Sequence, residues 1–344
     1  MKKIFIAVII CITGIMPVSA QSEGEKYTPF QFSFIYPLGT NGIHAPEYTN
    51  SVSINLLGGI SRNEKAFTLG GLANIIRHNA GGFQIAGLFN HIGNEGKGFL
   101  LSGLVSYTGN GYKGFQIAGL SNITKDVEGV QFAGLFNAAK DVKGVRFAGL
   151  SNIAKDVEGV QIAGLFNVAK DVKGVQFAGL LNVAERNDYP IALVNIIKHG
   201  EKGISLSYSE TGSAIVSFRS GGRVTYGIVG YGYNHKAEGS AFVAEGGLGA
   251  HIRCGSRFNI KNEVKIENFI SKNTTFKAGY HLLPAYRITP HLEVFAGPGI
   301  NYMQTDDLRN AGLFSSGISL WKKQEHAKIK QVHIGCSAGI QFIL

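Results

Sequence analysis

The chain has 344 residues, a formal net charge of +10, and 47 glycines against only 8 prolines. No linker-like change of composition divides it, so we expect one all-β protein rather than two soluble domains. The basic residues are spread along the sequence, which argues against a nucleic-acid partner. After residue 20 no stretch approaches about 18 consecutive apolar residues, which excludes a helical membrane span.

Residues 1–20 have the features of a secretory signal peptide. A basic start leads into an apolar run, and Val-Ser-Ala offers a small-residue cleavage site before Gln21. Cys11 lies inside the apolar run without small residues before it, so we expect no lipoprotein anchor. The pattern predicts an exported protein whose mature chain covers residues 21–344.

The first strands follow a short polar lead. Residues 30–37 alternate aromatic and polar side chains and predict a strand, and 38–49 form a loop punctuated by Gly and Pro. Further strands are expected at 51–59 and 66–75. The second of these is already a degenerate copy of the repeat that follows, so the repeat block spans about 66–197.

A unit of 15 residues recurs almost unchanged over 114–185, for example as GVQFAGLFNAAKDVK followed by GVRFAGLSNIAKDVE. Within a unit, one parity holds mainly apolar residues and Gly, and the other holds Gln, Ala, Leu and Asn. This period of two predicts one strand per unit. Recurring glycine pairs and β-branched residues on one parity disfavour a helix.

Two architectures accept one strand per unit: a stacked parallel solenoid, or antiparallel strands joined by tight turns. Each unit is nearly palindromic about its central Gly, so a hairpin of two units would pair Gly134 with Gly149 and Phe136 with Phe147. Such cross-strand pairs stabilise antiparallel ladders by roughly 0.2–1 kcal/mol each. A parallel solenoid would stack like on like and needs no palindrome, so the pattern favours antiparallel strands.

The turn sequences alternate between KDVE and KDVK. In an up-and-down sheet, alternate loops lie on opposite rims, which would give one acidic and one basic rim. Two other interpretations stay open: a two-unit segment was duplicated, or Glu and Lys pair between stacked coils.

Beyond the repeat, residues 203–344 continue as strands of alternating residues bounded by Gly, Asn, Asp, Pro or Ser. The end of the chain places apolar or small side chains on one face: Ile334, Cys336, Ala338, Ile340, Phe342 and Leu344. A final strand that is apolar on one parity and ends at the chain terminus is typical of outer-membrane barrels.

These features predict an antiparallel up-and-down transmembrane β-barrel that forms a single domain over residues 21–344. Strands of about 9–11 residues can cross a bilayer, and only a closed sheet leaves no unpaired backbone in lipid. We expect an even number of strands, on the order of 16–20. The outer face of the repeat has Gly at its centre and Ser in two units, which leaves little apolar side-chain surface for contact with lipid. The alternative is a β-solenoid repeat block with a smaller C-terminal barrel.

Residues 32–42 and the reiterated G-[VF]-Q-[IF]-A-G-L-x-N units followed by KDV resemble a family of uncharacterised bacterial surface-repeat proteins. The resemblance covers most of the mature chain. It implies location in the outer membrane or at the cell surface of a Gram-negative bacterium, and it carries no activity or functional residues.

The most conspicuous polar set is an amide ladder within the repeat, which we expect to face inward: Gln116, Asn122, Gln131, Asn137, Asn152, Gln161, Asn167, Gln176 and Asn182. It can line a polar lumen or bind a glycan, or its amides can satisfy one another. No nucleophile, base and orienting group can be assembled, so we expect no catalytic residue and no enzyme activity. We also expect no metal and no cofactor.

The sequence therefore predicts a non-enzymatic outer-membrane or surface barrel, either a scaffold or a pore of unknown cargo. The alternative is a secreted or surface adhesin that binds a glycan, and a lesser one is an outer-membrane barrel enzyme. Outer-membrane lipid is the expected partner. Lipopolysaccharide or a glycan is a further candidate, because residues 321–330 form a basic loop that begins with Trp321.

Overall fold

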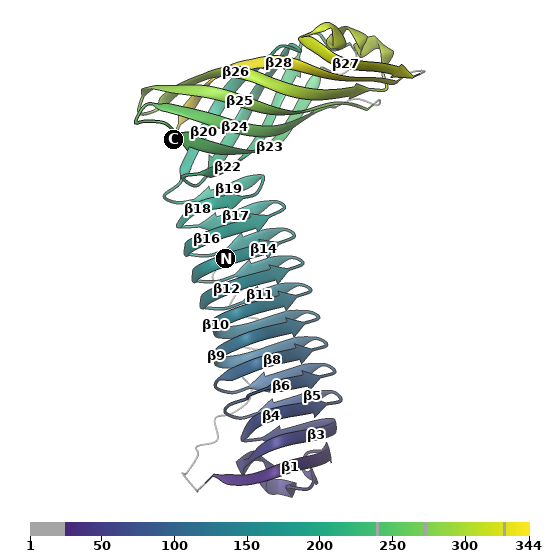
Figure 1. The fold of residues 1–344 in the computed structure, drawn as a ribbon, viewed down its shortest axis with the longest axis vertical. Coiled ribbons are helices and arrows are strands. Elements are labelled where there is room, and N and C mark those ends of the chain that lie inside the picture. The colour runs from purple at the N-terminus through teal and green to yellow at the C-terminus, as the bar shows by residue number, and fades with distance from the viewer. Residues whose placement is uncertain (1–24, 239–240, 271–273, 326–327) are drawn as a thin grey trace.

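The computed structural model describes residues 25–238, 241–270, 274–325 and 328–344. The signal peptide expected at 1–20 lies outside this part of the chain. The protein forms an elongated parallel β-solenoid followed by a closed antiparallel barrel (Figure 1). No helix within the described residues is long and apolar enough to cross a membrane.

The solenoid makes about ten turns over residues 49–197. Ahead of these turns, the first strand pairs in parallel with the third and caps the far end. A 3₁₀ helix, η1 (Gly42–Glu47), lies within this cap. The strands are β1 (Lys26–Ile35), β2 (Leu38–Gly39), β3 (Tyr48–Ser61), β4 (Asn63–Gly70), β5 (Ala73–Ile76), β6 (Phe83–Ala86), β7 (Phe89–Ile92), β8 (Gly96–Ser102), β9 (Val105–Ala118), β10 (Ser121–Ala133), β11 (Phe136–Ala138), β12 (Asp141–Ala148), β13 (Ser151–Ile153), β14 (Asp156–Ala163), β15 (Phe166–Val168), β16 (Asp171–Ala178), β17 (Leu181–Ala184), β18 (Arg186–Ile191) and β19 (Val194–Ile197).

Successive repeats stack in parallel with like on like. Gly129 aligns with Gly144, and Asn137 aligns with Asn152. The rings of Phe132 and Phe147 stack with centroids 4.7 Å apart. The expected single up-and-down barrel, with Phe136 opposite Phe147, is therefore wrong, and the solenoid alternative is confirmed.

The two glycines that make each unit palindromic are explained by the close approach of successive turns and not by hairpin pairing. Gly144 has φ +136°, and a Cβ there would lie 1.9 Å from the carbonyl oxygen of Gly129. At the corner between β12 and β13, a Cβ on Gly149 would lie 2.1 Å from the carbonyl oxygen of Gly134. Both glycines of the unit are needed where the backbone bends while keeping the interstrand spacing of about 4.7–4.9 Å.

The alternating turn sequences pair opposite charges between neighbouring turns. Glu128 aligns with Lys143, and Lys143 aligns with Glu158. One exposed ion pair joins Lys113 to Glu128 at 2.7 Å. The expectation of separate acidic and basic rims is therefore wrong. Glu and Lys lie side by side on neighbouring turns, which is the register that the stacked-coil interpretation requires.

The barrel has eight strands, because the first strand of its sheet also pairs with the last. The expected 16–20 strands are therefore wrong. One further strand, β27, lengthens the sheet at one rim beside η2 (Leu308–Ser315). The barrel strands are β20 (Glu201–Ser209), β21 (Ser213–Gly221), β22 (Thr225–Asn234), β23 (Phe242–Arg253), β24 (Phe258–Phe269), β25 (Thr275–Thr289), β26 (Leu292–Thr305) and β28 (Lys328–Ile343), with β27 at Ile318–Glu325.

The middle of the barrel is polar inside and apolar outside, whereas a buried apolar cluster that includes Phe269, Met303 and Phe314 fills the end beside η2. On β24, Lys261, Glu263 and Lys265 are buried in the lumen, whereas Val264 and Ile266 are more than half exposed on the exterior. The apolar parity of the last strand lies on this exterior as well. Eight strands give a lumen that side chains can fill.

The last turn of the solenoid is covered by one end of β21 and β22. The backbone N–H of Asn195 donates to the hydroxyl of Ser220 at 3.0 Å. A Cβ on Gly227 would lie 2.2 Å from the carbonyl oxygens of Ala192 and Leu193, so glycine permits this contact. The barrel thus protects the open sheet edge that a solenoid otherwise exposes.

Candidate functional site

The amide ladder lies in the core of the solenoid. Asn137 accepts a hydrogen bond from Asn122, and its amide nitrogen donates both to Asn152 at 2.9 Å and to the carbonyl oxygen of Phe147 at 2.8 Å. Each predicted ladder residue is fully buried: Gln116, Asn122, Gln131, Asn137, Asn152, Gln161, Asn167, Gln176 and Asn182. These side chains bond to one another and to the backbone, so they offer no surface to a ligand.

One turn interrupts the glutamine column. Arg146 occupies the position that Gln131 and Gln161 hold on the neighbouring turns. Its guanidinium donates to the carbonyl oxygen of Ile153 at 3.1 Å, but Nε and Nη2 find no partner among the described residues. Burial without a neighbouring anion lowers the pKa of Arg146 to about 9.

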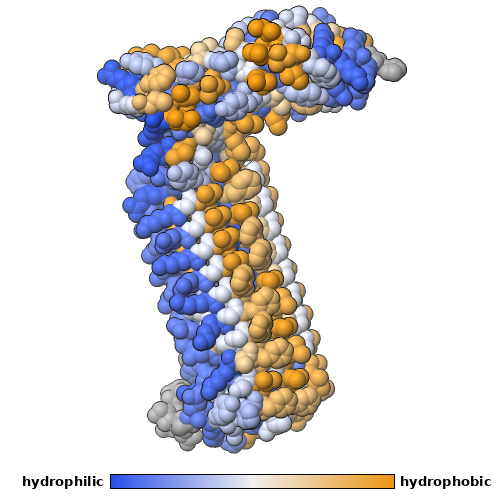
Figure 2. Space-filling view, viewed as in Figure 1, coloured by the Kyte–Doolittle hydropathy of each residue, from blue (hydrophilic) through white to orange (hydrophobic). Residues whose placement is uncertain are grey.

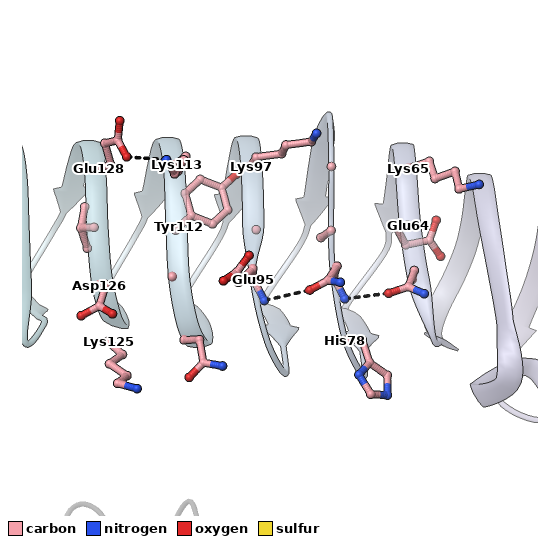
Figure 3. A pocket seen from close by; sticks show the side chains of 18 of the residues that line it. Glu64, Lys65, His78, Glu95, Lys97, Tyr112, Lys113, Lys125, Asp126 and Glu128 are labelled. Atoms are coloured by element: carbon pink, nitrogen blue, oxygen red, sulfur yellow. Dashed lines mark hydrogen bonds and ion pairs between the residues drawn. The ribbon is translucent and has the colours of Figure 1, made fainter. Parts of the chain in front are cut away.

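An open polar groove lies along the charged side of the N-terminal turns and has a volume of about 1210 Å³. Figure 3 shows that each turn contributes side chains to it in sequence, from Glu64 and Lys65 to Asp126 and Glu128. The groove is where the regular repeat breaks down. In later turns a valine such as Val142 fills the inward position that Glu64 and Tyr112 occupy here.

Two buried polar groups lie in the groove lining. Glu64 accepts hydrogen bonds through Oε1 from Asn50 at 3.0 Å and Ser53 at 2.7 Å, while its Oε2 finds no partner within the described residues. Burial raises the pKa of Glu64 above its ordinary value. The Tyr112 hydroxyl also lacks a partner there, and its ring fills the space left by Gly96.

Amides form a second, exposed ladder along the same side. Asn94 donates to Asn79 at 2.8 Å, and Asn110 donates to Asn94 at 2.5 Å. Close by, the ion pair with Lys113 lowers the pKa of Glu128. Amides beside ion-paired charges suit a neutral, hydroxyl-rich ligand better than a strongly charged one.

Across the described ranges no three His, Cys, Asp or Glu side chains gather as metal ligands. Cys254 and Cys336 are free and exposed. The expectation of a basic loop at 321–330 is wrong, because residues 321–325 lie in β27 and 328–330 in β28. Trp321 and Lys322 are exposed on β27.

The barrel lumen holds a network of ion pairs. Arg219 binds Glu263 through two hydrogen bonds of 3.0 and 3.2 Å, and the Tyr226 hydroxyl donates to the same carboxylate at 2.8 Å. Lys265 lies 3.3 Å from Glu245. Among the described strands, four cations and four carboxylates are buried in the lumen: Arg219, Lys261, Lys265 and Lys277, with Glu245, Glu263, Glu267 and Glu293. A further carboxylate, that of Glu210, is only 8% exposed and lies 3.9 Å from Lys277 and 3.0 Å from His333.

Sequence reasoning missed both the groove and the lumen network. The lumen had a signal, because residues 259–267 alternate polar or charged side chains with mostly apolar ones in a strand. The groove had none, since its members come from separate turns and differ in residue type. No family model, curated protein or solved structure matches this chain significantly.

Proposed function

We propose that this protein is a non-enzymatic outer-membrane protein in which the barrel anchors the solenoid as a scaffold. The observation that carries the proposal is the barrel's inverted polarity, with ion-paired side chains inside and aliphatic side chains outside. A soluble barrel would place its apolar side chains in the lumen. In lipid, the apolar exterior is solvated by acyl chains, and the closed sheet has no free edge within the bilayer.

The aromatic side chains on the exterior support the same proposal. Phe258, Tyr286 and Phe342 are exposed near the rim with short turns, and Tyr233 and Phe242 near the opposite rim. Aromatic girdles at both interfaces, with aliphatic residues between them, are characteristic of transmembrane barrels. The rim with short turns is also where the solenoid joins, and short turns usually face the periplasm, so the solenoid belongs on that side.

The lumen favours an anchor over a pore. Arg219 and Lys261 lie across the ring of Phe295, 5.0 and 4.8 Å from its centroid. Lys277 is paired with Glu267 at 3.0 Å towards the other rim. With these side chains filling an eight-stranded barrel, no water-filled channel is needed to explain its polar interior.

Membrane fractionation of the full chain tests the proposal. We expect recovery only in the detergent-extracted outer-membrane fraction, with different gel mobility in boiled and unboiled samples. Val264→Arg on the exterior should weaken the inserted barrel by about 2–4 kcal/mol, as arginine does at a bilayer midplane. Glu158→Arg on the exposed side of the solenoid is the control. A soluble protein with heat-insensitive mobility would overturn the anchor.

A second function, binding of a neutral glycan, is favoured by the groove. Its exposed amides come from successive turns and lie near the Lys113–Glu128 ion pair, which suits an extended chain of hydroxyls. Cosedimentation with purified peptidoglycan sacculi tests it. Asn79→Leu in the groove should reduce binding, whereas Lys170→Leu outside the groove should not. Equal binding by both variants would remove the groove as the site.

A further inference from the structure

One side of the solenoid carries an unbroken column of exposed leucines. Each stands at the corner that follows the second glycine of its repeat, or Ala192 in the last repeat, and Leu150, for example, is 42% exposed. We call this set the leucine column: Leu72, Leu88, Leu104, Leu120, Leu135, Leu150, Leu165, Leu180 and Leu193. Aromatic side chains flank it, among them Phe83, Phe115, Phe132, Phe166 and Phe177.

The strands on both sides of the leucine column contain no charge at their outward positions. We count positions from the first glycine of each repeat, for example Gly129, or from the residue that aligns with it. From Phe67 to Ile196, the residues one, three, seven and nine places after that position include no Lys, Arg, Asp or Glu. The polar members are Ser121, Ser151 and His91. Burial lowers the pKa of His91 and so disfavours its charged form. Two adjacent sides of the coil are therefore apolar along the repeat.

The charges are confined to the third side. In one turn these are Lys140, Asp141 and Lys143, and the equivalent residues of neighbouring turns align with them. Figure 2 shows the consequence, a hydrophilic edge and a hydrophobic side that both run the length of the solenoid. Exposed apolar surface of this extent marks an interaction site rather than a water-facing surface.

The barrel extends towards the hydrophobic side. In Figure 1 its strands run across the view, from the rim that bears the short turns and the C-terminus to the rim that bears β27, while the solenoid runs downwards from the first rim. In the same view the hydrophobic side of the solenoid faces the direction in which the barrel extends (Figure 2). If the barrel crosses a bilayer, the solenoid therefore lies along the membrane with its apolar side turned to the lipid.

We propose that the solenoid is a membrane-surface element, with the leucine column and its flanking phenylalanines in the lipid interface and the charged side in water. This proposal rests on the proposed membrane location of the barrel. It follows the physics of interfacial amphipathic helices, whose apolar face enters the boundary between headgroups and acyl chains by about 5–10 Å. The groove then stays open to water, because it lies on the charged side.

Lipid fits this surface better than a second copy of the chain. The apolar residues occupy two adjacent sides of a column, and a second solenoid docked on one side would leave the other in water. The barrel also projects over the hydrophobic side, where a second copy in the same membrane would have to place its own barrel (Figures 1 and 2). A fluid bilayer meets neither obstacle.

The test uses the full chain refolded into vesicles of phosphatidylcholine and phosphatidylglycerol. The 3 native cysteines are first replaced by serine. Two separate variants, Leu150→Cys and Lys143→Cys, are then each labelled with an environment-sensitive NBD fluorophore. Nitroxide-labelled lipids then quench whichever fluorophore touches the bilayer. We expect several-fold stronger quenching for Leu150→Cys than for Lys143→Cys. Heat-dependent gel mobility of the same sample reports insertion of the barrel independently.

A second readout uses the fluorophore at position 180, in the variant Leu180→Cys, and compares two triple variants. The first carries Leu135→Glu, Leu150→Glu and Leu165→Glu, and it should abolish quenching of the label. The second carries Lys140→Glu, Lys155→Glu and Lys170→Glu on the charged side, and it should leave the quenching unchanged. These substitutions are all exposed, so both variants should fold.

Each other result overturns the proposal. An inserted barrel with equal quenching at positions 143 and 150 would refute the surface location while the anchor stands. A blue-shifted but unquenched label at position 150 would show that protein, such as a second copy, covers the column. A barrel that does not insert would refute the anchor and the surface location together.

Discussion

Gln131 and Arg146 occupy equivalent positions on adjacent turns of the solenoid, yet no hydrogen bond joins their buried side chains in the described structure. Gln131 Oε1 is left without a partner on one side of the arginine, and Gln161 Nε2 on the other. Two segments of the glutamine column survive, Gln116 with Gln131 and Gln161 with Gln176. The arginine is the break between them.

Arg146→Gln should therefore stabilise the protein. The substitution removes an unpaired buried cation and supplies both missing partners, and we expect a gain of about 1–3 kcal/mol in the free energy of unfolding. Urea unfolding in detergent, followed by circular dichroism, measures it. The reverse change, Gln176→Arg, introduces a second break and should destabilise by a similar amount. A lower midpoint for Arg146→Gln would contradict this account.

Glu64 should make stability fall as the pH rises. Its folded pKa is raised by burial, so the folded state holds the proton more tightly than the unfolded chain. Above the ordinary glutamate pKa of about 4.3, the folded state must either keep a proton that the unfolded state has lost or bury a charge, and both lower the free energy of unfolding. Glu64→Gln should remove this slope between that pKa and the raised one.

Unfolding midpoints measured across a pH series check the Glu64 prediction. Glu128→Gln is the control, because it removes an exposed carboxylate whose pKa is lowered by its ion pair with Lys113. That variant should retain the fall of stability with pH. If Glu64→Gln and the wild-type chain show parallel curves, the carboxyl is not the source of the slope.

Gly149→Ala should destabilise the solenoid, although replacing glycine by alanine usually lowers the entropy cost of folding. Its Cβ would lie 2.1 Å from the carbonyl oxygen of Gly134, so neighbouring turns must separate. Overpacking of this kind costs about 1–3 kcal/mol or more. Gly111→Ala is the matched control, because the nearest atom there is 3.8 Å from the added Cβ. Equal thermal unfolding of the two variants would argue against the packing explanation.

Arg219→Leu should weaken the barrel by about 3–5 kcal/mol, because it leaves the buried Glu263 without its two-bonded partner. The temperature at which the folded gel band disappears in detergent measures the loss. Arg223→Leu breaks an exposed pair with Asp188 at 3.4 Å and should change that temperature little. A similar loss in both variants would mean that the buried pair is not the cause.

Part of the fold follows from local patterns. The alternation in the repeat correctly marks strands, and the parity of the last strand correctly groups Ile334, Ile340 and Phe342 on one face. The burial of Asn137 and its relatives agrees with an inward polar face. These features are readable because a strand's side-chain period of two does not depend on which strand lies beside it.

Only the tertiary structure decided between parallel and antiparallel stacking. The palindromic unit is compatible with a hairpin as a sequence pattern. In the structure, however, Gly144 and Gly149 are required because the preceding turn approaches closely, and sequence spacing does not reveal that approach. The same holds for Lys143, whose alignment with Glu128 and Glu158 on the neighbouring turns becomes visible only in the stacked register.

By itself, therefore, the sequence determined the strands, their inward amides and the alternation of apolar and polar faces along the strands of the C-terminal half. The tertiary structure decided the solenoid, the size of the barrel, the lumen pair of Arg219 with Glu263, and the groove around Glu64. The physical reason is that alternation records which face of a strand is buried. Which backbone pairs with it, and which side chains from distant turns then meet, depends on contacts that no local pattern encodes.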